Sequence, residues 1–382
     1  MFDLRRFTGR DMRLSDKFME FNWGFLLLLA AIASMGFAML YSVADGSFSP
    51  WALRQIIRFG VGAGILLVVA MVDLRLWMQL AYPIYAVALV LVAAVDVIGV
   101  TGMGAQRWLS IGPLQIQPSE IMKIALLLAL ARYFHGLTLD EVSRLRNLIV
   151  PVLIVMVPVA LVVKQPDLGT AILLSASGAV IFFAAGLRWR YFIFSGASVL
   201  AAIPIVWSRL HDYQRNRVFT FLDPERDPMG AGYHILQSKI ALGSGGVFGK
   251  GFMEGTQSHL NFLPEKHTDF IFTMLGEELG LVGGLLLLTL YFIVLMLSLN
   301  VSLECRNQFG RLLSLGVSVT FFFYVFINTA MVMGLLPVVG VPLPLVSYGG
   351  TSMLSLMFAF GLLMSAYIHR NQEIPRGPSA FW

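Results

Sequence analysis

Apolar segments long enough to cross a membrane recur along this chain, and they constrain its fold more than any other feature. A helix needs about 20 apolar residues to span the hydrocarbon core of a bilayer. Ten candidates lie near residues 21–43, 55–72, 77–98, 117–134, 147–163, 168–186, 191–207, 270–297, 309–334 and 346–368. Only 13% of the 382 residues are charged, roughly half the share of a soluble domain. The sequence therefore predicts an all-α, polytopic integral membrane protein, with residues 1–382 forming one domain.

The distribution of Lys and Arg predicts the orientation of these helices. An even number of spans places both termini on one side, and fifteen basic residues fall in the tails and loops of that side. The short loops of the opposite side hold three, namely Arg54, Arg107 and Lys164. Because positive charge marks the cytoplasmic side, we expect cytoplasmic termini and a large extracytoplasmic loop at residues 208–269. The net charge of +5 follows from this asymmetry and gives no reason to expect nucleic-acid binding.

The long loop contains two recognisable segments. Apolar residues at helical spacing between Tyr233 and Leu242 predict a short amphipathic helix lying on the membrane. The glycine-rich stretch Gly243–Gly251 looks like a phosphate-binding loop, but Ser244 stands at the first glycine position and Gly251 at the Ser/Thr position. We therefore expect either a flexible turn or a loop that shapes a lipid headgroup site. One cysteine, Cys305, excludes an intrachain disulfide framework.

Titratable residues crowd together where the long loop enters a spanning segment. The stretch 263–280 contains Glu265, Lys266, His267, Asp269, Glu277 and Glu278. A carboxylate at the position of Asp269 is close to lipid and partly desolvated, and perturbed titratable groups mark reactive sites. The alternative is that Thr268 or Asp269 caps the following helix. Capping alone does not account for the neighbouring charges, so the sequence favours chemistry at the membrane surface.

Charged residues also lie in or beside two other spans. Glu120 and Lys123 are three residues apart, so they share a helix face and can pair. A charged pair in a membrane helix is costly and usually faces a cavity, which favours a functional role over a purely structural one. Asp167 follows Lys164-Gln-Pro and suits either a helix cap or support of catalysis.

The last two spans are separated by a segment that is rich in proline and glycine, residues 334–352. Such a segment does not form a regular helix. Irregular backbone at membrane depth is tolerated where it is buried in protein or lines a wet cavity. Ser347, Tyr348 and Thr351 would place hydroxyl groups in such a cavity. The alternative is a plain re-entrant turn.

Several motifs, in order along the chain, resemble the SEDS family of bacterial shape, elongation, division and sporulation proteins. They are Gly104-Ala-Gln-Arg-Trp-Leu109, Gln117-Pro-Ser-Glu120, Lys164-Gln-Pro-Asp-Leu-Gly169, Leu263-Pro-Glu-Lys-His-Thr-Asp-Phe-Ile-Phe272 and Pro344-Leu-Val-Ser-Tyr-Gly-Gly350. The residues of these motifs are more similar to those of the elongation branch of the family than to those of the division branch. The resemblance implies a peptidoglycan glycosyltransferase that polymerises lipid II at the outer face of the bacterial cytoplasmic (inner) membrane. It also implies a class B penicillin-binding protein, a transpeptidase, as partner.

The resemblance carries roles onto particular residues of this chain. The family's essential acid falls on Asp269, its buried ion pair on Glu120 and Lys123, and its Gln-Pro-Asp carboxylate on Asp167. We expect Glu265 and His267 to support the site. Asp269 would act as general base on a sugar hydroxyl or hold a cation. The departing diphosphate would need positive charge or a divalent cation such as Mg²⁺. Candidate substrate-binding residues are Arg107, Arg215, Arg217, Lys239, Ser347 and Tyr348.

Two other functions compete with the enzyme at this point. A transporter, or flippase, of lipid-linked precursors would also use many helices and buried charges. Internal inverted repeats are typical of such transporters, and the sequence shows none. A pure scaffold would not account for Glu120 and Lys123 inside a helix. The large outer loop with its acidic cluster favours the enzyme.

Overall fold

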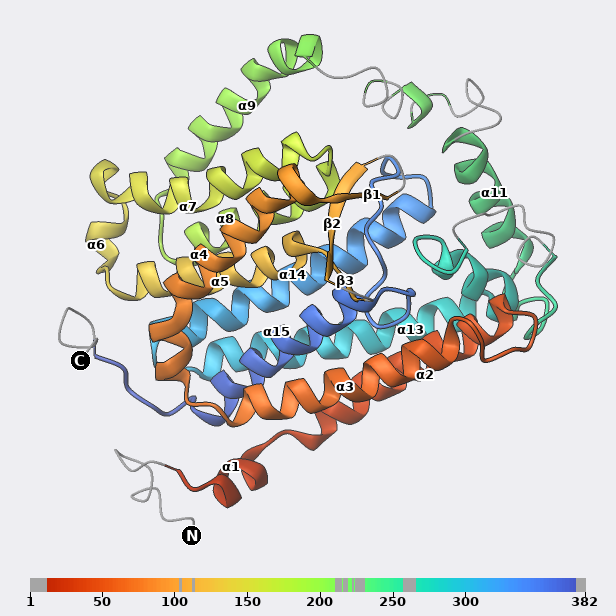
Figure 1. Cartoon of the computed structure of the whole chain (residues 1–382), viewed down its shortest axis with the longest axis horizontal. Helices are drawn as coiled ribbons and strands as arrows, with labels where there is room; N and C mark the ends of the chain where they lie inside the picture. Colours follow the sequence, from red (N-terminus) through yellow and green to blue (C-terminus); the bar gives the residue numbers. More distant parts are fainter. Residues whose placement is uncertain are drawn as a thin grey trace.

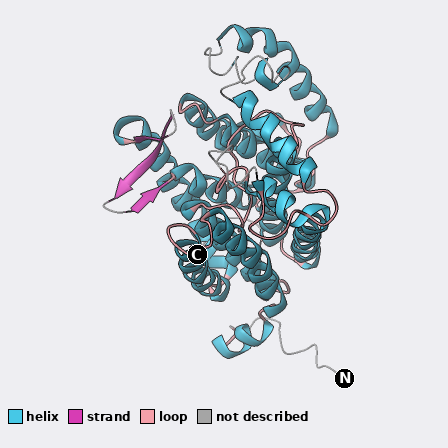
Figure 2. Ribbon diagram, turned by 90° about the vertical axis from the view of Figure 1, so that its right-hand side faces the viewer, coloured by secondary structure: helices cyan, strands magenta, loops and turns pink. Residues whose placement is uncertain are grey.

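A bundle of long helices, with one small sheet at its edge, makes up the computed structural model (Figures 1 and 2). The structure describes residues 12–102, 105–111, 114–209, 215, 219–221, 223, 231–256 and 266–375. The helices are α1 (Leu14–Glu20), α2 (Trp23–Val43), α3 (Ala52–Met71), α4 (Leu74–Ile98), α5 (Pro118–His135), α6 (Leu139–Val142), α7 (Leu145–Lys164), α8 (Leu168–Ala184), α9 (Trp189–Arg209), α11 (Ala231–Ser244), α13 (Ile271–Glu304), α14 (Gln308–Val332) and α15 (Gly350–Ile368).

Each of the ten predicted spans coincides with one of these helices, so the all-α polytopic fold is confirmed. In the described part of the chain, seven helices are long and apolar enough to cross a membrane: α2, α3, α4, α7, α13, α14 and α15. Among the other three, α8 is apolar but only 17 residues long. Figure 1 shows α1 and α6 at one end of the bundle and α11 at the opposite end.

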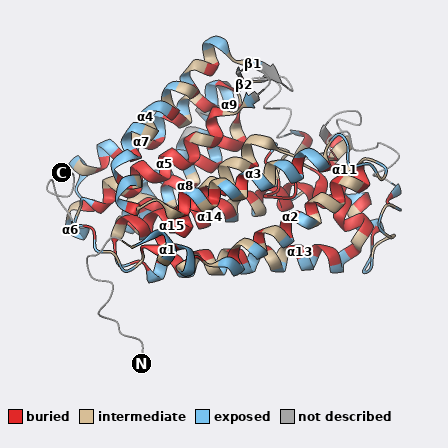
Figure 3. Ribbon diagram, turned by 60° about the horizontal axis from the view of Figure 1, so that its bottom comes forward, coloured by how far each residue is buried: buried red, intermediate tan, exposed pale blue. Residues whose placement is uncertain are grey.

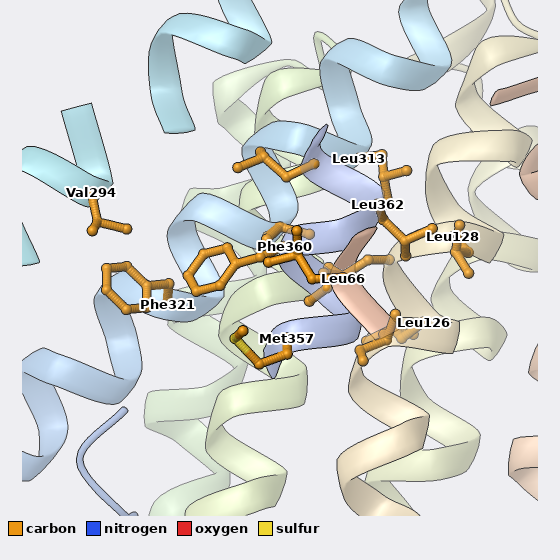
Figure 4. Packing of buried hydrophobic residues seen from close by; sticks show 14 of the residues in the cluster. Leu66, Leu126, Leu128, Val294, Leu313, Phe321, Met357, Phe360 and Leu362 are labelled. Carbon is orange, nitrogen blue, oxygen red and sulfur yellow. The ribbon is translucent and has the colours of Figure 1, made fainter. Parts of the chain in front are cut away.

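Burial follows the expectation for helices surrounded by lipid. Buried positions gather along the middle of the bundle, while α7 and α9 carry many exposed apolar side chains (Figure 3). At the centre, the rings of Phe321 and Phe360 pack edge to face with centroids 5.4 Å apart (Figure 4). Gly361 lets α15 approach α3, because a Cβ there would lie 2.7 Å from Cβ of Val69. Small residues at such contacts are typical of membrane helix packing.

A three-stranded antiparallel sheet was not expected from the sequence. It consists of β1 (Val100–Gly102), β2 (Ala105–Ile111) and β3 (Leu114–Ile116), in the order β1-β2-β3. The register pairs Val100 with Trp108 and Leu109 with Ile116. The sheet fills the connection between α4 and α5 and lies at the edge of the bundle (Figure 2). It places residues of β2 beside the start of α5.

A break divides α13, and the glycine-rich segment docks into it. Gly280 has φ 65° and ψ −163°, so the helix is interrupted one turn beyond Glu277. The amides of Lys250 and Gly251 donate to the carbonyls of Glu277 and Glu278, at 3.0 and 3.1 Å. In return, Leu281 and Val282 donate to the carbonyls of Gly246 and Val247, at 3.0 and 3.1 Å. The segment is therefore neither a phosphate loop nor a free turn. Its backbone forms hydrogen bonds with the amide and carbonyl groups that the break in the helix leaves without partners.

The expected helix near residues 233–242 is present as α11, and it packs on the bundle. The hydroxyl of Ser238 is fully buried and lies 2.8 Å from Oγ1 of Thr273 on α13. It also donates to the carbonyl of Val332 at the end of α14, at 2.8 Å. These two contacts fix α11 against the end of the bundle where α13 begins.

Candidate functional site

A polar cleft of about 190 Å³ opens where the starts of α5, α8, α13 and α15 meet. The described residues in its walls come from six separate stretches of sequence. The residues that line it are Arg107, Trp108, Gln117, Glu120, Lys123, Asp167, Thr170, Leu173, Thr268, Asp269, Tyr324, Gly340, Val341, Pro342, Tyr348, Gly349, Gly350, Thr351 and Ser352. The structure thus brings together five charged residues that are distant in the sequence: Arg107, Glu120, Lys123, Asp167 and Asp269.

The pair of Glu120 and Lys123 forms on one face of α5. Lys123 Nζ lies 2.6 Å from Oε1 of Glu120, and both side chains are almost fully buried. The phenol of Tyr324 on α14 donates to Oε2 of Glu120 at 2.8 Å and accepts a hydrogen bond from Lys123. The ammonium group lies 4.4 Å from the centroid of the same ring. A buried charged pair needs such additional partners, because desolvation otherwise outweighs its attraction.

Asp167 caps α8 and also lines the cleft. Its Oδ1 accepts a hydrogen bond from the amide of Thr170 at 3.2 Å, and its Oδ2 accepts one from the Thr170 hydroxyl at 3.0 Å. Nε of Arg107, on β2, lies 3.8 Å from Oδ2 of Asp167. Another nitrogen of Arg107 donates to the carbonyl of Pro166 at 2.6 Å. The sequence did not decide whether Asp167 caps a helix or supports catalysis. In the structure, its side chain has the geometry for both roles.

Asp269 lines the cleft immediately before α13. The N-cap residue of α13 is Phe270, which makes no side-chain cap hydrogen bond, so the capping alternative for Thr268 or Asp269 is wrong. The carbonyl of Asp269 accepts from Nδ2 of Asn328 at 2.9 Å, and the same amide group donates to Val341 at 2.8 Å. Gly340 has φ 70°, and a Cβ there would lie 3.5 Å from Oδ2 of Asp269. The carboxyl group therefore faces a glycine backbone across the cleft.

The proline-rich segment before α15 is irregular, as predicted, and it is held against the Asp269 segment. Ser347 donates from Oγ to the carbonyl of Thr268 at 2.6 Å and accepts from the amide of Leu343 at 2.8 Å. The amide of Tyr348 donates to the carbonyl of His267 at 2.9 Å. Irregular backbone is tolerated here because it is buried in protein and borders a polar cleft.

Other predicted site residues lie outside the cleft. Ser347 supports its wall through the hydrogen bonds above, and the ring of His267 stacks on Trp51 with centroids 4.9 Å apart. Arg215 donates to the carbonyl of Ser208 at 3.0 Å. Lys239 is exposed on α11. Glu265 and Arg217 lie outside the described residues.

Sequence reasoning missed Tyr324, the hydroxyl that completes the ion pair. It lies in a run of phenylalanines, Phe321 to Phe323, where only its single polar atom distinguishes it. Trp108 and Gln117 were inside the quoted motifs but received no role; both line the cleft, and Gln117 donates to Asp167 at 3.4 Å. Polar atoms in an apolar run are the signal that could have identified Tyr324.

Carboxyl groups outnumber cations among the described residues that line the cleft. Two cationic side chains, Arg107 and Lys123, face three carboxyl groups, Glu120, Asp167 and Asp269. In the described part of the chain, no group of three or more His, Cys, Asp or Glu side chains is arranged to hold a metal ion. Nearby, burial lowers the pKa of the Lys266 ammonium group below its ordinary value, and the Asp45 carboxylate opposes that effect.

Comparison with known proteins gives matches over nearly the whole chain. The family model described as "Cell cycle protein", FtsW/RodA/SpoVE, matches residues 19–372. Peptidoglycan glycosyltransferase MrdB of Escherichia coli (strain K12) is 47% identical over 346 residues, which is 90% of this chain and 93% of that protein. A probable peptidoglycan glycosyltransferase FtsW of Trichlorobacter lovleyi is 38% identical, covering 91% of this chain and 93% of that protein.

Solved structures match as well. A chain from a study of how a peptidoglycan synthase complex coordinates polymerization and crosslinking has a TM-score of 0.81 and 34% identity. That match covers 92% of this chain and 99% of the other. The rod shape determining protein RodA of Thermus thermophilus has a TM-score of 0.70 and 31% identity, covering 92% of this chain and 98% of that one.

Proposed function

This chain belongs to the FtsW/RodA/SpoVE family, and we propose that the cleft around Asp269 is where it builds glycan strands. It is a multi-pass protein of the bacterial inner membrane and a peptidoglycan glycosyltransferase of cell elongation, like its relative MrdB. This relationship decides against the transporter and scaffold alternatives. The observation that carries the site proposal is the convergence of Glu120, Lys123, Asp167 and Asp269 on one polar cleft.

Asp269 is the catalytic carboxylate of this proposal. A sugar hydroxyl of the acceptor attacks the anomeric carbon of a lipid II donor, and the bond from that carbon to the diphosphate oxygen breaks. The proton of the hydroxyl passes to the Asp269 carboxylate, and the bonding electron pair leaves with the diphosphate. A sugar hydroxyl is a poor nucleophile until a base takes its proton. In support, Asp269 lines the cleft at the start of α13 and is not the N-cap of that helix.

The other charged residues hold the walls of the cleft in place. Glu120 and Lys123 neutralise each other, and Tyr324 fixes both, which joins α5 to α14. Asp167 and Arg107 join α8 to β2 in the same way. A rigid frame of this kind keeps donor and acceptor in reactive geometry, which is a large part of catalysis between two bound substrates.

The partner of the enzyme is a class B penicillin-binding protein, which crosslinks the strands that this chain polymerises. The support is the match to a chain from a peptidoglycan synthase complex that couples polymerization to crosslinking. We further propose that residues 1–382 act as one domain with cytoplasmic termini and the loop 208–269 outside. This orientation puts the cleft at the outer face, where lipid II presents its sugars.

Replacing Asp269 with Asn tests the catalytic assignment. Asn keeps the shape of the side chain but removes its charge and its ability to accept a proton. Polymerisation of purified lipid II by the full-length chain with its partner should fall by at least about 100-fold. The matched control is Asp140→Asn, on exposed α6 at the other end of the bundle, which should leave the rate unchanged. Near-normal turnover by Asp269→Asn at normal protein level would remove Asp269 from the chemistry.

A further inference from the structure

Arg58 is a cation inside a membrane helix, on the rim of the cleft, that neither the motifs nor the mechanism above uses. It lies on α3, two turns from the start of the helix. A charged residue within a span is costly and usually marks a functional path. Its guanidinium Cζ lies 4.6 Å from the centroid of the Tyr348 ring, and Tyr348 lines the cleft.

One face of α3 borders both segments that hold the cleft. Trp51, Gln55 and Arg58 recur at helical spacing, so they share a face. Trp51 stacks on His267, two residues before Asp269, with centroids 4.9 Å apart. Gln55 donates from Nε2 to the carbonyl of Ser347 at 2.8 Å. This face therefore brings Arg58 to the place where the Asp269 segment meets the segment before α15.

Gly350 leaves room for the guanidinium group at this position. A Cβ at Gly350 would lie 3.1 Å from both Cζ and Nε of Arg58, closer than most real Cβ contacts. Gly350 lines the cleft and is the first residue of α15. The N-cap of α15, Gly349, makes no side-chain cap hydrogen bond, and a helix N-terminus adds partial positive charge. Arg58 thus contacts two residues that line the cleft, Tyr348 and Gly350.

The described residues supply no carboxylate that neutralises the charge of Arg58. Within the part of the chain that the structure describes, no carboxylate forms an ion pair with it, and its Nη1 is buried without a hydrogen-bond partner. By contrast, Lys123 is paired with Glu120, and Arg107 lies beside Asp167. Among the described residues that line the cleft, the charged side chains sum to −1, from two cations and three carboxylates. On their own they would repel an anionic ligand.

We propose that Arg58 binds the diphosphate of the lipid-linked donor. This assignment rests on the proposed function, because the glycosyl transfer is what creates a leaving diphosphate. A guanidinium group presents several N–H donors in a fork that matches phosphate oxygens, and it is always charged. The half-exposed side chain of Arg58 lies on the rim, where a lipid-anchored diphosphate can reach it while the sugar extends toward Asp269.

Two variants of Arg58 separate charge from shape. In the full-length chain with its partner, Arg58→Gln should raise KM for lipid II by about 10- to 100-fold, the loss expected for a hydrogen bond to a charged group. Arg58→Lys keeps the charge and should recover part of that loss. Lys164→Gln is the control, since Lys164 is 72% exposed, pairs with Asp96 and does not line the cleft. It should leave KM unchanged.

A binding measurement without turnover completes the test. Farnesyl diphosphate should raise the Tm of the wild-type protein and inhibit polymerisation, and both effects should weaken at least about 10-fold in Arg58→Gln. Farnesyl monophosphate and inorganic pyrophosphate are the comparison arms; stronger binding of pyrophosphate than of farnesyl diphosphate would overturn the assignment to a lipid-anchored group. Equal KM and equal farnesyl diphosphate affinity in wild type and Arg58→Gln would also overturn it. Polymerisation by the wild type remains a separate test of the proposed function.

Discussion

The hydroxyl of Tyr324 completes the hydrogen bonding of a buried charged pair. It belongs to α14, while Glu120 and Lys123 belong to α5, and its hydroxyl contacts both. Because all three side chains are buried, the carboxylate and the ammonium group have few other partners. Removing a hydrogen bond to a buried charged group leaves it unsatisfied, at a cost of about 1–3 kcal/mol. The phenol therefore contributes to the cleft although it sits in an aromatic run.

We expect Tyr324→Phe to lower polymerisation by about 10-fold and to reduce Tm, because Glu120 loses a donor without gaining another. Tyr85→Phe is a matched control, since its hydroxyl donates to the carbonyl of Ile154 at 2.9 Å, away from the cleft. Lipid II polymerisation and thermal unfolding of both variants give the comparison. Equal activities in Tyr324→Phe and Tyr85→Phe would show that the phenol plays no special part.

At the scale of elements, the break in α13 is held open by the segment that docks into it. Gly249 has φ 81°, and a Cβ there would lie 2.1 Å from the carbonyl oxygen of Glu278. Glu277 and Glu278 are fully buried beside the break. Lys250 pairs with Glu277 at 2.7 Å, and Ser42 of α2 donates to Glu278. Backbone and side chains thus hold α2, the glycine-rich segment and α13 together at one point.

Gly249→Ala should destabilise the protein by at least about 1–2 kcal/mol, because alanine is strained at positive φ and its Cβ would clash with the helix backbone. Gly243→Ala is the control, since a Cβ at Gly243, within α11, would meet nothing within 4 Å. There alanine should be neutral or slightly stabilising. Thermal unfolding in detergent measures both. Similar Tm values for the two variants would mean that the docked segment adds no stability.

For the whole molecule, the two ends of the helical bundle carry different groups. Arg370, after α15, pairs with Glu20, at the end of α1, at 3.3 Å, so the first and last described helices meet at one end. The cleft lies at the starts of α5, α8 and α15, whereas Arg370 follows the end of α15. With an even number of spans, this geometry requires the two ends of the chain to share one side. From the asymmetry of Lys and Arg, we predict that this side is the cytoplasm.

Single cysteines test this orientation. Glu254→Cys, on the exposed turn before α13, should react with a membrane-impermeant thiol reagent in intact spheroplasts. Asp140→Cys, on α6 at the opposite end, should react only after lysis. The native Cys305 is 6% exposed and gives little background. The reverse labelling pattern would mean that the cleft faces the cytoplasm.

The spans were predictable because length and apolarity are local properties of the sequence. Two charged members of the cleft were predictable for a similar reason, because Glu120 and Lys123 lie within an apolar span, whereas Asp167 was identified by its place in the Lys164–Gly169 motif. The sheet was not, since its strands pair through short, irregular stretches that carry no clear alternation. The break at Gly280 was also missed, because a single glycine is tolerated within a helical pattern. Its positive φ depends on a partner segment about thirty residues earlier.

The position of Arg58 could not be read from its own surroundings either. It falls inside an apolar run, and only the packed bundle shows that its side chain reaches Tyr348 and Gly350. Conversely, Lys239 stood in the long outer loop and was a candidate for substrate binding, yet α11 holds it outside the cleft. Contacts between distant segments decide which cationic side chains reach the cleft. The linear sequence pattern does not show those contacts.

The hydrogen bonds that join Ser347 and Tyr348 to Thr268 and His267 have a consequence for biosynthesis. They link segments 79 residues apart, and the later one immediately precedes the final span. A ribosome delivers that span last, so the growing chain occupies the membrane with nine spans inserted while its cleft still lacks a wall. Each newly made molecule therefore stays inert until translation is almost complete. Premature termination anywhere before α15 yields a membrane protein that has no assembled site.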